Sequence, residues 1–190
     1  MRKVVFLDRD GVINRDPGNW TKYDYVTRWE EFFFINGSIG ALKRLKEAGY
    51  KICLISNQAG ISKGYFSRED LDKINRKMLS EIEKGGGKID ELYYCHHQSA
   101  DDCGCRKPKT GMIEEALKNT HVNLRNTFIV GDSWRDVEAG KKMGMKTVLV
   151  LSGKSSLSDI KNWPSRPDYV KKDLSEAVDL ILKGGAKGGR

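Results

Sequence analysis

Short apolar runs alternate along this 190-residue chain with segments of helical periodicity. The first run is Val4–Leu7, and further runs lie at 51–56, 89–95, 127–130 and 147–151. Runs of this kind are typical of strands buried on both faces, and strands that alternate with helices pack side by side in a parallel sheet. The alternation therefore predicts an α/β fold, in which helices cover both faces of a parallel sheet.

The predicted helices are marked by apolar spacing and by their ends. Ser67 and Asp70 have the spacing of a capping box, and Gly85 begins a run of three glycines that ends the segment. The apolar residues between them recur as on the buried face of a helix, and they are Leu71, Ile74, Met78 and Ile82. Further helices are predicted over 38–48, over 111–119 with Thr110 as its cap, over 134–143, and after Asp173 with Leu174, Val178, Ile181 and Leu182 facing inward.

Length and composition indicate one globular domain. We expect residues 1–183 to form that domain and the glycine-rich end, 184–190, to be a disordered tail. No run approaches the roughly 18 apolar residues of a membrane helix, and no signal sequence precedes the first strand. We therefore expect a cytoplasmic monomer with no membrane partner. The net charge of +8 comes from residues scattered through the sequence, which favours solubility over a dedicated nucleic-acid surface.

Two acids, Asp8 and Asp10, directly follow the first apolar run, and Gly11 comes next. They are expected where the strand ends, at the edge of the sheet where α/β proteins place their sites. Two neighbouring carboxylates repel each other and are best tolerated when a cation shares their charge, so the pattern indicates a metal site. Asp and Gly are also ordinary turn residues, and this motif alone fits a polar turn equally well.

Polar motifs also follow three further predicted strands. Ser56 and Asn57 end the second strand, Lys107 follows the third, and Asp132 ends the fourth, with Asp136 one helical turn beyond it. The carboxyl ends of parallel strands lie at one edge of the sheet, so these side chains are expected to converge with the two acids. Carboxylates that bind magnesium, opposite an ammonium group and hydrogen-bond donors, are typical of a phosphate-handling site.

In combination, the four motifs resemble those of the haloacid dehalogenase superfamily of phosphatases, over nearly the whole chain. The resemblance implies a Rossmann-like, haloacid dehalogenase-like fold and magnesium-dependent hydrolysis through an aspartyl-phosphate. It implies that Asp8 is the nucleophile and that Asp10 is the general acid and base. It also implies that the magnesium ligands are Asp8, Asp132 and the backbone carbonyl of Asp10, that Ser56, Asn57 and Lys107 bind the phosphate, and that Asp136 supports the metal or Lys107.

The gaps between the motifs leave no room for a separate cap domain. Each gap is filled by one predicted helix and its loops. The site is therefore covered by loops, left open, or closed by a partner. The irregular, aromatic segment Arg15–Phe34 directly follows the acidic motif, and we expect it to form a wall of the site.

A second cluster of metal-ligating residue types immediately precedes Arg106 and Lys107. Three thiolates and one imidazole complete a tetrahedral zinc site of the structural type, which would fix the loop that carries Lys107. His97 is expected to be the imidazole, because Cys95-x-His97 resembles a pattern in one subgroup of these phosphatases, and His96 is the alternative. The expected ligands are Cys95, His97, Cys103 and Cys105.

That subgroup contains the D-glycero-D-manno-heptose 1,7-bisphosphate phosphatases and the histidinol-phosphate phosphatases. The runs at 56–66 and 105–112 are similar to the heptose branch, which implies removal of the 7-phosphate from a small phosphorylated sugar. A second phosphate needs a cation some distance from Asp8, and Arg106 and Lys63 are available on flanking loops. His96 stands where the subgroup usually has proline, and the short zinc loop is like that of the histidinol branch.

Other functions stay open at this point. The same motifs fit a phosphatase for histidinol phosphate or for a nucleic-acid 3′ end, although we expect no nucleic-acid partner. A different class is a zinc-containing nucleic-acid-binding module that has lost activity. The intact Asp8 and Asp10 argue against that class, because a module that only binds nucleic acid has no need of them.

Overall fold

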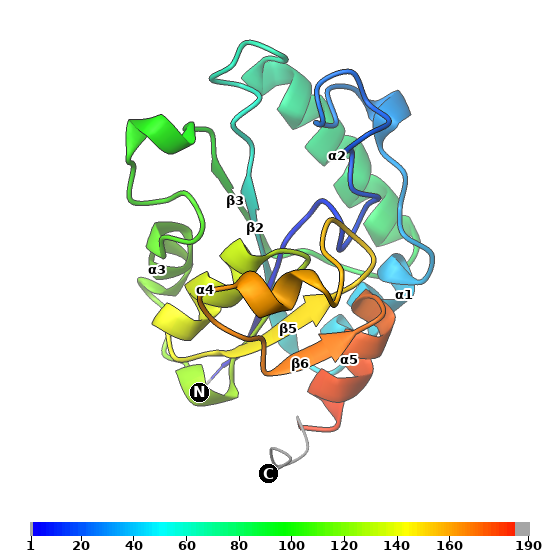
Figure 1. The fold of residues 1–190 in the computed structure, drawn as a ribbon. Coiled ribbons are helices and arrows are strands. Elements are labelled where there is room, and N and C mark those ends of the chain that lie inside the picture. Colours follow the sequence, from blue (N-terminus) through cyan, green and yellow to red (C-terminus); the bar gives the residue numbers. More distant parts are fainter. Residues whose placement is uncertain (1, 185–190) are drawn as a thin grey trace.

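A computed structural model describes residues 2–184 of the chain (Figure 1). Its centre is a six-stranded sheet in the order β3-β2-β1-β4-β5-β6, and all five pairs of neighbouring strands are parallel. The strands are β1 (Lys3–Leu7), β2 (Tyr50–Asn57), β3 (Glu91–Cys95), β4 (Phe128–Gly131), β5 (Lys146–Val150) and β6 (Tyr169–Lys171). The predicted parallel sheet is confirmed.

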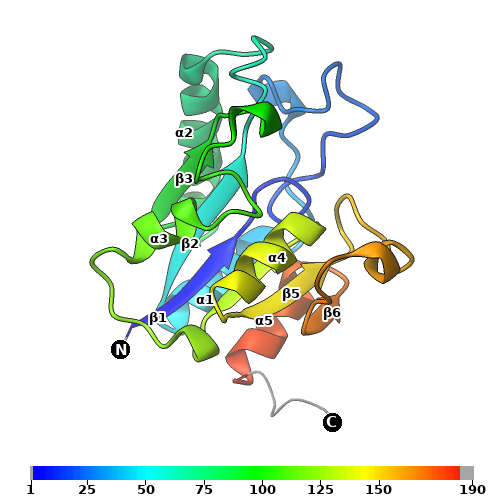
Figure 2. The ribbon, with the colours of Figure 1, turned by 60° about the vertical axis from the view of Figure 1, so that its left-hand side comes forward.

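Five α-helices cover both faces of this sheet (Figure 2). Side chains alternate along each strand, so that Val5 and Leu7 belong to the core cluster beneath the first, second and fifth helices, whereas Val4 and Phe6 belong to the cluster beneath the third and fourth. The helices are α1 (Ser38–Glu47), α2 (Arg68–Lys84), α3 (Gly111–Leu117), α4 (Trp134–Lys142) and α5 (Leu174–Leu182). Short 3-10 helices are η1 (Trp29–Glu31), η2 (Ser99–Asp101), η3 (Leu124–Asn126) and η4 (Asp159–Asn162).

Most predicted helix ends agree with the structure, and two details were wrong. The capping box at Ser67 and Asp70 is present. Thr110 caps no backbone N–H, because its hydroxyl donates to the Glu114 carboxylate instead. Leu182 does not face inward: it is the last residue of α5, 39% exposed, and the buried stripe of that helix ends at Ile181.

The carboxyl ends of the central strands face the loops that carry the sequence motifs. Leu7, the last residue of β1, lies beside Leu54 of β2 and Val130 of β4, so the polar residues that follow each strand emerge at one edge. Only η1 and α1 lie between β1 and β2, and only α2 lies between β2 and β3, so no separate cap domain is present in residues 2–184. Over that same range, none of the helices is both long and apolar enough to cross a membrane.

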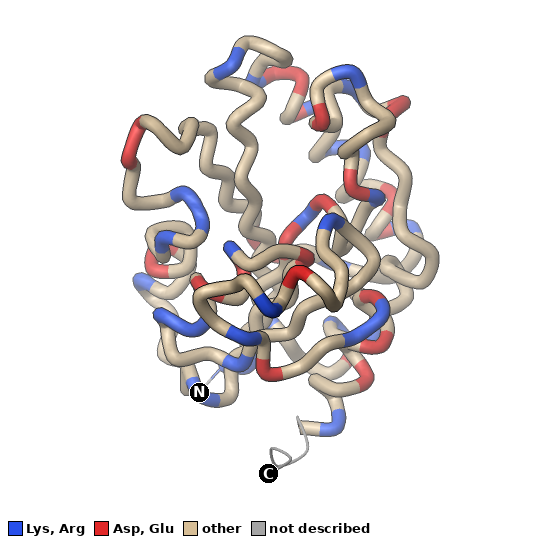
Figure 3. The backbone as a smooth tube through the Cα atoms, viewed as in Figure 1, with Lys and Arg blue, Asp and Glu red and all other residues tan. Residues whose placement is uncertain are grey.

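Two predictions concern the chain as a whole. Lys and Arg are distributed along helices, strands and loops alike, as expected from their scatter in the sequence (Figure 3). Apart from Gly184, the predicted tail 184–190 lies outside the described residues.

Candidate active site

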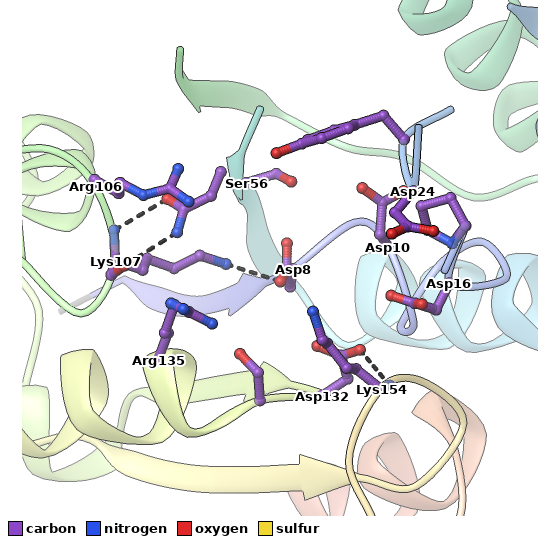
Figure 4. A pocket seen from close by; sticks show the side chains of 14 residues that line it. Asp8, Asp10, Asp16, Asp24, Ser56, Arg106, Lys107, Asp132, Arg135 and Lys154 are labelled. Atoms are coloured by element: carbon purple, nitrogen blue, oxygen red, sulfur yellow. Dashed lines mark hydrogen bonds and ion pairs between the residues drawn. The ribbon is translucent and has the colours of Figure 1, made fainter. Parts of the chain in front are cut away.

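A cavity of about 200 Å³ opens at the carboxyl edge of the sheet, between the ends of β1, β2 and β4 (Figure 4). Seven of the residues predicted for the site line it, namely Asp8, Asp10, Ser56, Asn57, Arg106, Lys107 and Asp132. Asp136, the supporting residue, lies just beneath them and is 1% exposed. The predicted convergence of the strand ends is therefore present in the structure.

Lys107 is the buried cation of this cavity, and it is 2% exposed. Its Nζ lies 2.9 Å from Asp8 Oδ2, donates to Asp136 Oδ1 at 2.6 Å and donates to the Ile55 carbonyl at 2.8 Å. All three ammonium donors thus have an acceptor. Burial lowers the pKa of Lys107, but the carboxylates of Asp136 and Asp8 outweigh it and raise that pKa above its usual value. The side chain therefore stays charged at any physiological pH.

Asp136 is occupied on both oxygens. Oδ1 accepts from Lys107, and Oδ2 accepts from the backbone N–H and the hydroxyl of Ser133, in a capping box at the start of α4. The sequence leaves two positions open for Asp136, one beside the metal and one beside Lys107. These contacts favour the position beside Lys107. Asp136 holds the ammonium group in position.

Asp8 and Asp132 are acids in an environment that disfavours their charge. Burial raises the pKa of Asp8 to about 6; Lys107 opposes this, whereas the carboxylates of Asp136 and Asp10 add to it. Burial also raises the pKa of Asp132, again with Asp8 and Asp136 adding to the effect. Carboxylate oxygens of Asp8, Asp132 and Asp136 lie within 4.8 Å of one another. Hard oxygen donors with excess negative charge fit a divalent cation such as magnesium.

Two glycines, Gly11 and Gly153, pack directly against the Asp132 carboxylate. A Cβ added to Gly11 or to Gly153 would lie 2.2 or 2.1 Å from Asp132 Oδ2, closer than any side chain permits. The same oxygen accepts from the backbone N–H of Lys154 at 2.7 Å. Gly11 also has φ +78°, a conformation that favours glycine. The orientation of Asp132 is thus fixed by backbone on two sides.

Asn57 joins the end of β2 to the loop that carries Lys107. Its Oδ1 accepts from the Lys107 backbone N–H at 3.0 Å, and its Nδ2 donates to the Lys107 carbonyl at 3.1 Å. Both ends of the amide are therefore engaged with protein. Ser56 lies beside it, 2% exposed, and its hydroxyl oxygen accepts from Gln58.

The four residues predicted to bind zinc also come together, about the loop between β3 and α3. The Sγ atoms of Cys95, Cys103 and Cys105 lie 3.2 to 3.6 Å apart, and His97 Nδ1 lies 3.7 and 3.4 Å from the first and last of them. Tetrahedral zinc with Zn–S bonds of about 2.3 Å places its ligand atoms roughly 3.5–3.8 Å apart, so the spacing fits. His96 is outside the cluster, with its ring stacked on Tyr94.

Some residues of the cavity were not found from the sequence. Asp16, Asp24 and Tyr25 come from the segment predicted to form a wall, whereas Arg135 lies on the first turn of α4 and Lys154 follows β5. For Arg135, the sequence offered one signal of a place in the site: this residue lies between Asp132 and Asp136, within one motif. Lys63, expected as a cation for a second phosphate, does not line the cavity: its ammonium lies over the rings of Tyr25 and Tyr65, 5.5 and 5.8 Å from their centroids.

The chain is similar to known phosphatases over almost its full length. A family model described as "HAD-hyrolase-like" matches residues 104–177. The D-glycero-beta-D-manno-heptose-1,7-bisphosphate 7-phosphatase of Pasteurella multocida is 39% identical over 188 residues, which cover 95% of this chain and 97% of that protein. The protein of that name from Haemophilus influenzae is 39% identical, covering 96% and 98%.

Solved structures give the same result. A D,D-heptose 1,7-bisphosphate phosphatase from B. bronchiseptica, complexed with magnesium and phosphate, superposes with a TM-score of 0.86 at 32% identity and covers 95% of this chain and 98% of its own. The corresponding protein from Burkholderia thailandensis has a TM-score of 0.69 at 30% identity, with coverage of 98% and 100%.

Proposed function

This chain belongs to the HAD-like hydrolase family that contains the heptose 1,7-bisphosphate 7-phosphatases and is a phosphomonoester hydrolase, and we propose that it removes the 7-phosphate of D-glycero-D-manno-heptose 1,7-bisphosphate. The family relationship supports the reaction. The observation that carries the choice of a bisphosphate is a second group of cations on the wall of the catalytic cavity, Arg106 and Arg135.

The first half of the reaction requires a nucleophile and an acid. A carboxylate oxygen of Asp8 attacks phosphorus and forms an aspartyl-phosphate, while Asp10 gives a proton to the departing sugar oxygen. The backbone N–H of Arg9, 2.7 Å from Asp8 Oδ1, and the ammonium of Lys107 orient the Asp8 carboxylate. Lys107 also faces the cavity where the phosphoryl oxygens would lie. In the second half, Asp10 accepts a proton from the water that hydrolyses the aspartyl-phosphate.

Asp8, Asp132 and the backbone carbonyl of Asp10 would hold magnesium. When bound, the ion neutralises charge on the phosphoryl group and on the carboxylates around it. The raised pKa values of Asp8 and Asp132 support this assignment, and so does the close packing of Gly11 and Gly153 against Asp132.

Arg106 and Arg135 supply the second group of cations. Both line the cavity, and neither forms an ion pair with a carboxylate within residues 2–184. Arg106 donates to the His97 carbonyl at 3.1 Å, and the Arg135 guanidinium lies 4.9 Å from the centre of the Trp134 ring. The two side chains lie on the Lys107 side of the site (Figure 4). Partly oriented guanidinium groups without a counter-charge suit a phosphate that does not react.

We further propose a structural zinc ion bound by Cys95, His97, Cys103 and Cys105. Four protein ligands leave no open position, so this ion would act on the loop rather than on the substrate. Cysteines that bind zinc as thiolates must stay reduced, which supports the cytoplasm as the compartment. Few large apolar side chains are exposed in the described part of the chain, which supports a monomer.

The test compares kcat/KM, with magnesium present, for heptose 1,7-bisphosphate, heptose 7-phosphate, histidinol phosphate and a 3′-phosphorylated oligonucleotide. We expect the bisphosphate to be the best substrate. Replacing Arg135 by Ala should reduce the ratio of bisphosphate to monophosphate kcat/KM by about tenfold, the loss expected for a charged hydrogen bond of about 1.5 kcal/mol. Arg125→Ala, on η3 and outside the cavity, is the matched control. A higher kcat/KM for histidinol phosphate or for the oligonucleotide would contradict the proposed substrate.

The chemistry has its own test. Asp8→Asn should abolish turnover of all four substrates, because an amide cannot attack phosphorus. Substantial residual activity in that variant would contradict the nucleophile, whatever the substrate.

A further inference from the structure

The carboxylate of Asp10 is held by three side chains that are themselves completely buried. Arg9 donates from Nε to Oδ1 at 3.1 Å and from Nη2 to Oδ1 and Oδ2 at 2.9 and 3.0 Å. Asn14 Nδ2 donates to Oδ1 at 2.8 Å, and Gln58 Nε2 donates to Oδ2 at 2.9 Å. Arg9, Asn14 and Gln58 are each 0% exposed, whereas the Asp10 side chain is 17% exposed. We call these three residues the Asp10 clamp.

Arg9 is held to Asp10 by the attraction of opposite charges as well as by hydrogen bonds. Asp10 is its only ion-pair partner within the described residues, and the Arg9 Nη1 atom has no hydrogen-bond partner there. Separating a buried guanidinium from its single counter-charge is strongly unfavourable, because the desolvation of the charge is then uncompensated. The Asp10 carboxylate is therefore confined to the position that Arg9 gives it.

The clamp draws on three separate segments. Arg9 follows β1, and Asn14 belongs to a turn that returns to the same strand end, where the Gly11 N–H donates to the Asn14 carbonyl at 2.7 Å. Gln58 follows β2, and its Nε2 also donates to the Ser56 hydroxyl oxygen at 3.2 Å. The position of Asp10 relative to the phosphate-binding strand end is thus set by the packing of two strands.

We propose that Arg9, Asn14 and Gln58 are positioning residues that orient Asp10 toward the departing oxygen and stabilise the carboxylate that remains once Asp10 has given its proton to that oxygen. While Asp10 carries the proton, the oxygen that bears it accepts fewer of these N–H bonds, and in the second half of the reaction the attacking water returns a proton to Asp10. The proposal rests on the role of Asp10 in the proposed function. Four N–H donors hold both carboxylate oxygens, and the exposed edge of the group faces the cavity. None of the three side chains donates to Asp8 or Lys107. Loss of a donor should therefore affect protonation of the leaving group more than attack on phosphorus.

The dependence of rate on the leaving group separates these two effects. Protonation matters most when the departing oxygen is strongly basic, as in an alkyl phosphate, less for phenyl phosphate, and least for 4-nitrophenyl phosphate. We expect Gln58→Met and Asn14→Leu, which remove donors from different segments, each to lower kcat/KM about thirtyfold for the alkyl ester and less than about threefold for the 4-nitrophenyl ester. The first figure is part of the roughly 10²–10⁴-fold that general acid catalysis supplies. Asp10→Asn should show the same trend more strongly.

Ser62→Ala is the matched control. Its hydroxyl donates to the Ala59 carbonyl in the loop that follows Gln58, and within residues 2–184 Ser62 forms no hydrogen bond with a residue of the site. We expect an equal, small effect on all three esters. Thermal unfolding followed by circular dichroism identifies any variant that fails to fold, and the two clamp variants provide independent tests.

The outcomes distinguish this inference from the proposed function. A uniform loss across the three esters, or no loss, in a folded clamp variant would overturn the inference, provided that Asp10→Asn shows the leaving-group trend. A wild-type enzyme that hydrolyses none of the esters and no heptose bisphosphate would overturn the proposed function itself. The inference would be supported if the loss of kcat/KM increases with the basicity of the leaving group in Asp10→Asn and in both clamp variants, but not in Ser62→Ala.

Discussion

Replacing the nucleophile Asp8 by Asn should make the metal-free protein more stable. The Asp8 side chain is 13% exposed, and burial together with the neighbouring acids Asp136 and Asp10 disfavours its charge despite the ion pair with Lys107. Asn has nearly the same shape and carries no charge. The variant therefore removes an unfavourable charge without opening a cavity.

The magnitude follows from the pKa of Asp8. A rise from 3.8 to about 6 corresponds to about 3 kcal/mol of unfavourable ionisation at pH 7.5, at about 1.4 kcal/mol per pH unit. Because this shift already includes the favourable interaction of Asp8 with Lys107, it is itself the net cost, and the Asn variant should gain up to about 3 kcal/mol. Domains of this kind are stable by roughly 5–15 kcal/mol, and such a change is measurable.

The sign of the pH dependence is fixed by the direction of the shift. A carboxyl group whose pKa is raised on folding destabilises the native state when it is ionised, and this cost is fully present above the folded pKa of Asp8, about 6. It disappears as the pH falls below the unfolded value of about 4. The stability advantage of Asp8→Asn should therefore be largest near pH 7.5, decrease through pH 6 and vanish near pH 4.

Urea unfolding followed by circular dichroism, with EDTA present and over pH 4–8, measures this difference. Adding magnesium should stabilise the wild type more than the variant and close the gap, because the ion binds the native carboxylates. Asp72→Asn, an exposed acid on α2, is the control and should show no such trend. A variant less stable than the wild type at pH 7.5 in EDTA, or a gap independent of pH, would refute the reasoning.

Three further outcomes are expected. Asp10→Asn should have the opposite sign in the same unfolding experiment and lose about 3 kcal/mol, because it leaves the buried Arg9 without its counter-charge; a gain in stability would contradict the pairing. Gly153→Ala should raise the magnesium concentration for half-maximal activity at least about tenfold, because the added Cβ collides with Asp132 Oδ2; an unchanged requirement would argue against Asp132 as a ligand. The wild type should contain about one zinc per chain by metal analysis and Cys103→Ser less, with lower activity; equal contents would argue against the site.

The fold could be predicted from the sequence because its signal is local. Apolar runs such as Val4–Leu7 and helical spacing such as that of 71–82 identify each element by itself, and their alternation implies a parallel sheet. The order β3-β2-β1-β4-β5-β6 has no such local signal, since it depends on which strands pack together. Leu182 was assigned to the core by periodicity alone, and spacing does not show where the core ends.

The candidate site could be predicted where its residues follow strands. Asp8, Ser56 and Asp132 are positioned by regular structure, whereas Asp24 and Lys154 lie on loops whose path only tertiary packing determines.

The identity of the histidine in the predicted zinc cluster follows from a simple property of extended chain. Successive side chains point to opposite sides, so that His97 lies on the side of Cys95, and His96 stacks on Tyr94 on the other side. The sequence contained this alternation. To choose between the two histidines, one also needs to know that the chain stays extended past Cys95, the last residue of β3.

The buried charges of the site explain why it needs a divalent ion. Asp10 pairs with Arg9 alone, whereas Asp136 and Asp8 share Lys107. Asp132 has no ion-pair partner in the described chain, so these four carboxylates at the base of the cavity face two cations, apart from Asp16 and Asp24 on the wall. The remaining charge of −2 is neutralised by one divalent cation such as magnesium. A phosphate dianion then adds charge that the rim must balance, and Arg106, Arg135 and Lys154 lie at the rim without an ion-pair partner in residues 2–184. The positive residues at the rim are thus required by the substrate, and the negative residues at the base by the metal.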